Sequence, residues 1–119
     1  MKPIAPTDRI VRNIQRAPFK PFVTDGKVLP GHSYLQLDDS FPEMTGFHIY
    51  RMAPGATSQP HEHSCHEQFL VIEGEVTDND GTVYGPGDFV LLKDGTQHWS
   101  TTVDGCTLAV FIRALERNL

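Results

Sequence analysis

A chain of 119 residues has room for one domain, since two separate hydrophobic cores would each be too small to be stable. Its 39% hydrophobic and 21% charged residues are ordinary for a folded globular protein and exclude wholesale disorder. The net charge of −5 argues against nucleic acid or an anionic membrane as the main partner, and no apolar run is long enough to cross a bilayer.

The first residues, 1–8, lack the apolar core of an export signal, so we expect a cytoplasmic protein. Cys65 and Cys106 are the only cysteines, which is too few for a disulfide framework. We expect both to be reduced thiols, although one bridge between them stays open at this point.

Glycine and proline divide the chain into short segments, as is typical of an all-β protein. Residues 1–35 are expected to be an N-terminal arm or strand segment, and residues 36–119 a barrel or sandwich within the same single domain. Ile10, Val11 and Ile14 predict a helical turn within residues 7–16. The seven predicted strands are 33–37, 46–52, 67–73, 75–77, 82–84, 89–92 and 107–114.

Three of the six histidines lie between positions 61 and 66, directly before Glu67. In an extended segment the side chains alternate, so His61, His63 and Glu67 project to the same side. Two imidazoles and a carboxylate are a suitable ligand set for a first-row metal. A solvated, histidine-rich loop would be the alternative, but the apolar run 69–72 offers a rigid element that can hold exact ligand geometry.

These residues resemble the first motif of the cupin family: glycine, five residues, His-x-His, three residues, glutamate, six residues, glycine. Gly55, His61, His63, Glu67 and Gly74 fill every fixed position of this motif.

The family's second motif is matched at Gly87, Gly95 and His98, whereas Lys93 replaces the usual proline and Thr102 the usual asparagine. A narrower similarity links the chain to the cupin domains of certain anti-sigma factors and to acetylacetone-dioxygenase-like cupins.

The resemblance implies a small antiparallel jelly-roll (cupin) β-barrel that binds one divalent metal ion. Carried over residue by residue, the metal ligands are His61, His63, Glu67 and His98. This ligand set suits Fe, Zn, Ni, Mn, Co or Cu, with iron or zinc favoured, and leaves coordination positions open for a substrate. The family also implies a homodimer, which would cover exposed sheet edges.

Catalytic residues are not determined by the sequence, but Tyr50 and Arg51 are candidates for orienting a substrate carboxylate or enol. His48, Tyr50 and Met52 share one face of the strand 46–52, and Phe47, Ile49 and Arg51 share the other. One of these two sets is expected to line the cavity. Cys65 is expected to be an inert thiol, and His66 to lie outside the metal shell.

Three functions are compatible with these residues. The first hypothesis is a metalloenzyme that acts on a small organic molecule, with an Fe(II)-dependent dioxygenase as the leading assignment. The alternatives are a non-catalytic metal-dependent sensor or binding module, and a redox-neutral isomerase or lyase, which would need an additional acid or base.

Overall fold

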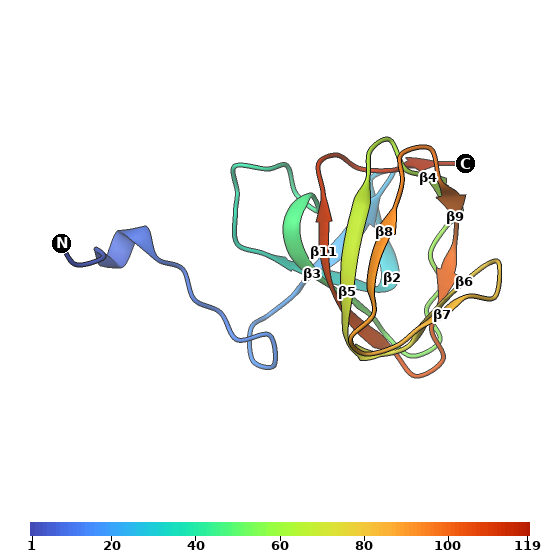
Figure 1. Cartoon of the computed structure of the whole chain (residues 1–119), viewed down its shortest axis with the longest axis horizontal. Coiled ribbons are helices and arrows are strands. Elements are labelled where there is room, and N and C mark those ends of the chain that lie inside the picture. The colour runs from blue at the N-terminus through green and yellow to red at the C-terminus, as the bar shows by residue number, and fades with distance from the viewer.

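The computed structural model describes residues 1–119 and contains three antiparallel sheets. The largest has six strands, and its hydrogen-bonded order is β1 (Lys20–Thr24), β2 (Lys27–Gln36), β3 (Gly46–Met52), β11 (Cys106–Ile112), β5 (Glu67–Gly74) and β8 (Phe89–Leu92) (Figure 1). The strand order departs from chain order, because β11 inserts between β3 and β5. This crossing order is expected of a jelly roll.

Two small sheets lie apart from the six-stranded sheet. One contains β10 (Ser100–Thr101), β6 (Val76–Asp78) and β7 (Val83–Tyr84), and the other contains β12 (Arg117–Asn118), β4 (His61–Glu62) and β9 (Gln97–His98). The three sheets form a jelly roll without joining into one continuous hydrogen-bonded barrel. The only helical element is the short 3₁₀ turn η1 (Pro6–Asp8), and no helix has the length and apolar character to span a membrane.

The all-β prediction is confirmed, and the predicted strands 46–52 and 89–92 coincide with β3 and β8. The helix prediction for residues 7–16 is wrong beyond η1, because Ile10 and Val11 are exposed and bury no apolar face. The strands β1, β4, β9, β10 and β12 were not predicted, and β2 begins earlier than predicted. All of these except β1 and β2 have only two residues, too few to show a side-chain alternation.

Alternating side chains of the six-stranded sheet form the hydrophobic core. Inward residues of three neighbouring strands are almost completely buried, among them Met52, Phe69, Val71, Leu108 and Val110. Strand β11 pairs with β3 over its whole length and with β5 on its other side. It is therefore the central support of the sheet whose inner face carries the pocket described below.

Gly74 ends β5 at a close approach of two backbone segments. Its φ of +77° lies in the left-handed region, and a Cβ placed there would be 2.1 Å from the carbonyl oxygen of Gly105. Both the conformation and the contact require a residue without a side chain. The last glycine of the first motif is thus a packing requirement.

Replacing Gly74 with alanine should lower the free energy of unfolding by about 3 kcal/mol or more, because the backbone of Gly105 must move. Gly81→Ala is the matched control, since Gly81 also has positive φ (+88°) but a Cβ at this position would meet nothing within 4 Å. The control should lose only about 1 kcal/mol from left-handed strain. Chemical denaturation measures both, and equal losses would contradict the packing argument.

Candidate metal centre

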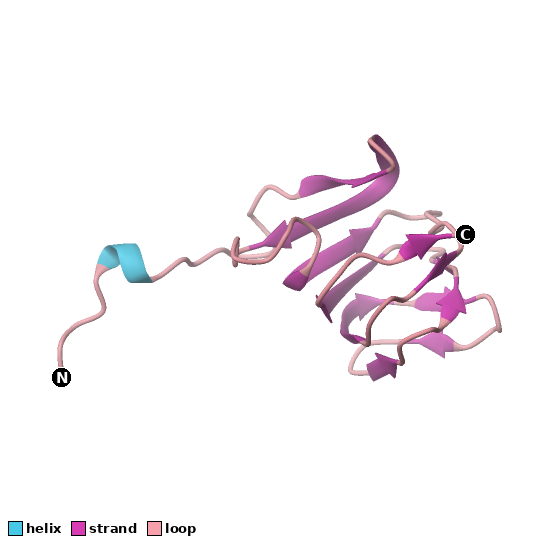
Figure 2. Cartoon of the chain, turned by 90° about the horizontal axis from the view of Figure 1, so that it is seen from above, coloured by secondary structure: helices cyan, strands magenta, loops and turns pink.

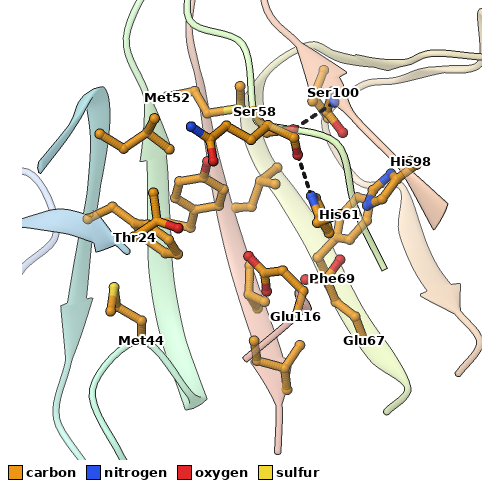
Figure 3. Close-up of a pocket in the computed structure, with 18 of the residues that line it drawn as sticks. Thr24, Met44, Met52, Ser58, His61, Glu67, Phe69, His98, Ser100 and Glu116 are labelled. Atoms are coloured by element: carbon orange, nitrogen blue, oxygen red, sulfur yellow. Dashed lines mark hydrogen bonds between the residues drawn. The ribbon is translucent and has the colours of Figure 1, made fainter. Parts of the chain in front are cut away.

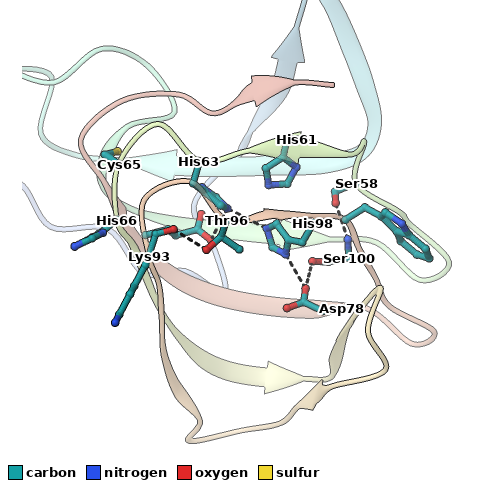
Figure 4. A network of polar contacts seen from close by, with 12 residues as sticks. Ser58, His61, His63, Cys65, His66, Asp78, Lys93, Thr96, His98 and Ser100 are labelled. Atoms are coloured by element: carbon teal, nitrogen blue, oxygen red, sulfur yellow. Dashed lines mark hydrogen bonds and ion pairs between the residues drawn. The ribbon is translucent and has the colours of Figure 1, made fainter.

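The short pairing of β4 with β9 brings distant histidines together. His61 in β4 lies directly opposite His98 in β9, and opposite residues of an antiparallel pair point to the same face. His63 follows β4 and is tied to the neighbouring loop by backbone hydrogen bonds with Thr96 (2.9 Å) and Gly95 (2.8 Å). Figure 4 shows the three imidazoles facing one another.

The ring nitrogens of these three histidines form a compact group. One ligand atom from each of His61, His63 and His98 lies within 4.8 Å of the others, and the Nε2 atoms of His63 and His98 are 3.0 Å apart. Two nitrogens that bind one metal at about 2.1 Å each lie roughly 3–3.5 Å apart. The spacing of the imidazoles therefore fits a shared divalent metal.

The tautomers of two histidines are set by acceptors behind them. His61 Nδ1 donates to the carbonyl of Gln59 at 2.7 Å, and His98 Nδ1 donates to Asp78 Oδ1 at 2.9 Å. Each of these bonds leaves the Nε2 lone pair free, which is the form that binds a metal. The tautomers of His61 and His98 therefore fit metal binding, as does the spacing of the three imidazoles.

Burial favours the uncharged form of two of the three histidines, His61 and His63. It lowers the pKa of His61, and it lowers the pKa of His63 to about 4 with a further contribution from the neighbouring His61 and His98. At neutral pH these two rings present lone pairs rather than positive charges. A cation is the natural partner for such a group.

Glu67, the fourth predicted ligand, lies beside the cluster rather than within it. Its Oε1 is 3.7 Å from His63 Nε2, and its side chain is 16% exposed. Burial raises the pKa of Glu67 to about 8, with smaller contributions from Glu116 and Asp78. The carboxyl group is therefore near enough to join a bound metal after a small movement, but it is not in the tight group of three.

Asp78 contacts the candidate metal centre through His98 and was not predicted from the sequence. Its Oδ1 accepts from His98 and from Ser100 Oγ (2.6 Å), and its Oδ2 accepts from the Tyr84 hydroxyl (2.7 Å) (Figure 4). Burial raises its pKa, but the hydrogen bonds from His98, Ser100 and Tyr84 outweigh this effect and lower the pKa overall. The Asp-Asn-Asp-Gly sequence at positions 78–81 indicated only a turn, so no sequence signal separated Asp78 from its neighbours.

A pocket adjoins the histidines, and its volume of about 840 Å³ includes open solvent at its mouth. His61, His98 and Glu67 form part of one wall, and Thr24 and Met44 lie on the opposite side (Figure 3). Ten of the 21 lining residues are hydrophobic, and none is lysine or arginine. The pocket thus offers apolar surface and hydrogen-bond acceptors but no cationic side chain for an anionic ligand.

The two catalytic candidates lie on opposite faces of β3. Tyr50 lines the pocket together with His48 and Met52, so this set of side chains is the one that faces the cavity. Arg51 points to the other face, where it donates to the carbonyl of Ile14 at 2.6 Å and stacks on Phe19 at 4.1 Å. Arg51 therefore does not reach the pocket.

The Tyr50 hydroxyl is already engaged. His32 Nε2 donates to the carbonyl of Thr57 at 3.0 Å, which leaves His32 Nδ1 to accept the hydrogen of the Tyr50 hydroxyl. Burial raises the pKa of Tyr50. Tyr50 is held as a neutral donor to His32, and this buried contact between β2 and β3 was not foreseen.

His48 offers the pocket an uncommitted nitrogen outside the group of three imidazoles. Its Nδ1 donates to the carbonyl of Gly46 at 3.0 Å, and burial lowers its pKa, so the neutral ring retains an Nε2 lone pair. Glu116, from the segment before β12, is a second acceptor in the pocket lining.

His66 and Cys65, which lie between His63 and Glu67 in the sequence, make contacts outside the cluster. His66 Nδ1 accepts from the backbone of Asp94 at 2.8 Å, and Cys65 Sγ lies 3.7 Å from the carbonyl of Ala114. Cys65 and Cys106 are both free, as expected.

Known structures share this architecture. The polyketide cyclase RemF from Streptomyces resistomycificus aligns with a TM-score of 0.67 at 20% identity, covering 92% of this chain and 86% of that one. An acetylacetone dioxygenase from Acinetobacter johnsonii aligns with a TM-score of 0.67 at 12% identity, covering 92% and 76%. At these identities the likeness establishes the fold alone.

A third structure is the Rhodobacter sphaeroides complex of SigE with the anti-sigma ChrR. It aligns with a TM-score of 0.63 at 18% identity over 85% of this chain, which spans about half (51%) of the matched chain. No curated protein sequence matches this chain. The family profile described as the ChrR cupin-like domain matches residues 7–116, nearly the whole sequence. The chain therefore belongs to the ChrR cupin-like domain family.

Proposed function

We propose that the chain is a metalloenzyme for a small, uncharged organic molecule, with an Fe(II)-dependent dioxygenase as the leading assignment. The observation that carries the proposal is a group of three imidazoles, two of them at the wall of a partly apolar pocket. His61, His63 and His98 would hold one divalent metal, and Glu67 would complete the set. Open positions on that metal would face the pocket, as a catalytic site requires.

The chain's own residues define what the pocket accepts. Because no lysine or arginine lines it, a carboxylate or phosphate would find no counter-charge among the side chains. Phe22, Leu29 and Met44 favour an apolar body, and His48 and Glu116 favour a hydroxyl donor on the substrate. A phenol, an enol or a dione in its enol form has these properties.

The metal would supply a Lewis-acid centre that polarises a substrate oxygen or, as iron, a centre that reacts with oxygen. The protein's part is to position the substrate and to handle its proton. The free Nε2 of His48 is suited to accept a hydrogen from a substrate hydroxyl, whereas Tyr50 donates to His32 and holds the pocket wall in place.

Two other functions have specific support. The match to the ChrR cupin-like domain favours a metal-dependent sensor or binding module, and the likeness to a polyketide cyclase favours a redox-neutral reaction. A cytoplasmic location and a homodimer remain predictions from composition and family.

Anaerobic reconstitution with Fe(II) followed by oxygen-electrode measurements tests the leading function. With a panel of β-diones and phenols, we expect stoichiometric iron and iron-dependent oxygen uptake with at least one compound. The His98→Ala protein serves as the control for free iron in the assay. Tightly held zinc with no oxygen chemistry would contradict the assignment in favour of a sensor, and substrate conversion without oxygen would contradict it in favour of an isomerase or lyase.

Replacement of His61 or His98 with alanine should reduce bound metal from near one per chain to near zero, because each removes one of three closely spaced ligands. His66→Ala is the control, since His66 lies outside the cluster and its loss should leave the metal bound. Elemental analysis after reconstitution and gel filtration measures occupancy, with circular dichroism to verify the fold. Full metal occupancy in both the His61→Ala and the His98→Ala variant would contradict the assignment of the metal site to these histidines.

Asp78→Asn should weaken metal binding about 10- to 100-fold, because the amide no longer fixes the His98 ring with a charged acceptor. Asp80→Asn is a matched control in the same turn, where the carboxylate only accepts from the backbone of Thr82 at 2.9 Å. Competition with a chelator measures the dissociation constants. Equal constants for the two variants would show that Asp78 does not position the ligand.

A further inference from the structure

The segment of residues 53–60 supplies an acceptor for one of the candidate metal ligands. It leads from β3 in the six-stranded sheet to β4 in a small sheet, and it belongs to no strand (Figure 2). The carbonyl of Gln59 in this segment accepts from His61 Nδ1 at 2.7 Å. The orientation of the His61 ring therefore depends on where the backbone of this connecting segment is held.

The same segment contacts the residue that orients a second ligand. Ser58 and Ser100 share two hydrogen bonds, each of 2.8 Å. The Ser58 amide donates to the Ser100 carbonyl, and the Ser100 amide donates to Ser58 Oγ. Ser100 Oγ in turn donates to Asp78 Oδ1 at 2.6 Å, and the same oxygen accepts from His98 Nδ1 (Figure 4). The segment is thus linked to the acceptors behind two of the three imidazoles.

His32 fastens this segment to the six-stranded sheet. It lies in β2, is 3% exposed, and donates from Nε2 to the carbonyl of Thr57 at 3.0 Å. Its Nδ1 accepts the hydroxyl hydrogen of Tyr50 in β3, and the two rings stack with 5.8 Å between their centroids. A neutral imidazole has one donor and one acceptor nitrogen, which is what a carbonyl on one side and a hydroxyl on the other require.

The other hydrogen bonds of the segment do not replace this contact. At its start, the amide of Ala53 donates to the carbonyl of Gly31 at 2.8 Å, which ties that end to β2. Further along, Thr57 Oγ1 lies 3.1 Å from Thr101 Oγ1, but Thr101 belongs to β10 in a small sheet. Between residues 54 and 60, the bond from His32 is the hydrogen bond that joins the segment to the six-stranded sheet.

We propose that His32 is a positioning residue for the candidate metal centre. By holding Thr57 against the six-stranded sheet, it fixes the two following residues. These residues in turn set the orientation of the His61 and His98 rings. His32 is not part of the pocket lining, so it acts through the segment rather than on a metal or a substrate. The proposal rests on the metal ligands of the proposed function, but it does not depend on the reaction.

Titration with Co(II) tests this role, because the visible absorption of bound Co(II) reports the geometry of its ligands. His32→Phe keeps a ring but removes both hydrogen bonds, so the dissociation constant for Co(II) should rise at least about 10-fold and the absorption bands should shift. His32→Gln, whose amide carries a donor and an acceptor, should restore most of the affinity. Val71→Ala is the control, since Val71 is buried in the core outside the pocket lining and its truncation should lower stability alone. An equal loss of affinity in the control would contradict the assignment.

Tyr50→Phe is a milder variant that frees one nitrogen of His32 and can be studied without metal. NMR of the metal-free protein should show hydrogen exchange at the Ser58 amide and at His61 Nδ1 at least about 5-fold faster than in the unsubstituted chain, because His32 holds the segment less firmly. Unchanged Co(II) affinity and absorption in a folded His32→Phe protein, or unchanged exchange in the Tyr50→Phe protein, would overturn the positioning role. A chain that binds no Co(II) yet shows the faster exchange would contradict the proposed function and support the role of His32.

Discussion

The antiparallel pairing of β4 with β9 is the constraint on which the candidate metal centre depends. It involves only two residue pairs, yet it places His61 opposite His98, which lie far apart in the sequence. Backbone bonds of His63 with Gly95 and Thr96 extend this short ladder, and β12 pairs with the other edge of β4, where Leu119 donates to the carbonyl of Pro60. Without that register the histidines would be ordinary loop side chains.

Burial then decides the chemistry of the centre. Burial lowers the pKa of His61 and His63. The acceptors Gln59 and Asp78 direct the Nδ1 hydrogens of His61 and His98 away from the cluster. The result is a group of three ligand atoms within 4.8 Å of one another. Glu67 responds to the same burial in the opposite sense, and its raised pKa shows how costly an isolated charge would be there.

Side-chain alternation gives the six-stranded sheet two different faces, one that lines the pocket and one that faces away from it. Along β3, His48, Tyr50 and Met52 face the pocket, whereas Phe47 and Arg51 lie on the opposite face of the sheet. One strand therefore contributes both to the wall of the pocket and to an exposed apolar surface. Arg51 contacts the N-terminal segment at Ile14 and Phe19. Its position next to Tyr50 in the sequence gave no indication of this contact.

Local features could be predicted from the sequence. The spacing of His61, His63 and Glu67 and the similarity at His98 indicated the metal centre, and period-two alternation in β3 gave the two possible faces. Contacts that depend on register between distant segments could not be predicted in this way. The bonds of Asp78 to His98 and of Tyr50 to His32 join residues 20 and 18 positions apart, and nothing in either local pattern predicts them.

Two-residue strands such as β4 and β9 were missed for a related reason. They are held in place by the larger sheet and by loops rather than by their own propensity, so their sequences carry no strand signal. The fold class followed from turns and alternation, but the details that position the ligands come from tertiary contacts.

X-ray absorption spectroscopy of the reconstituted protein tests the central claim most directly. The account predicts a metal with three imidazole nitrogens at about 2.0–2.2 Å, together with oxygen ligands and no sulfur. In the His98→Ala protein this spectrum should disappear with the metal. A spectrum dominated by sulfur from Cys65 or Cys106, or one without imidazole scattering, would contradict the assignment of the three histidines.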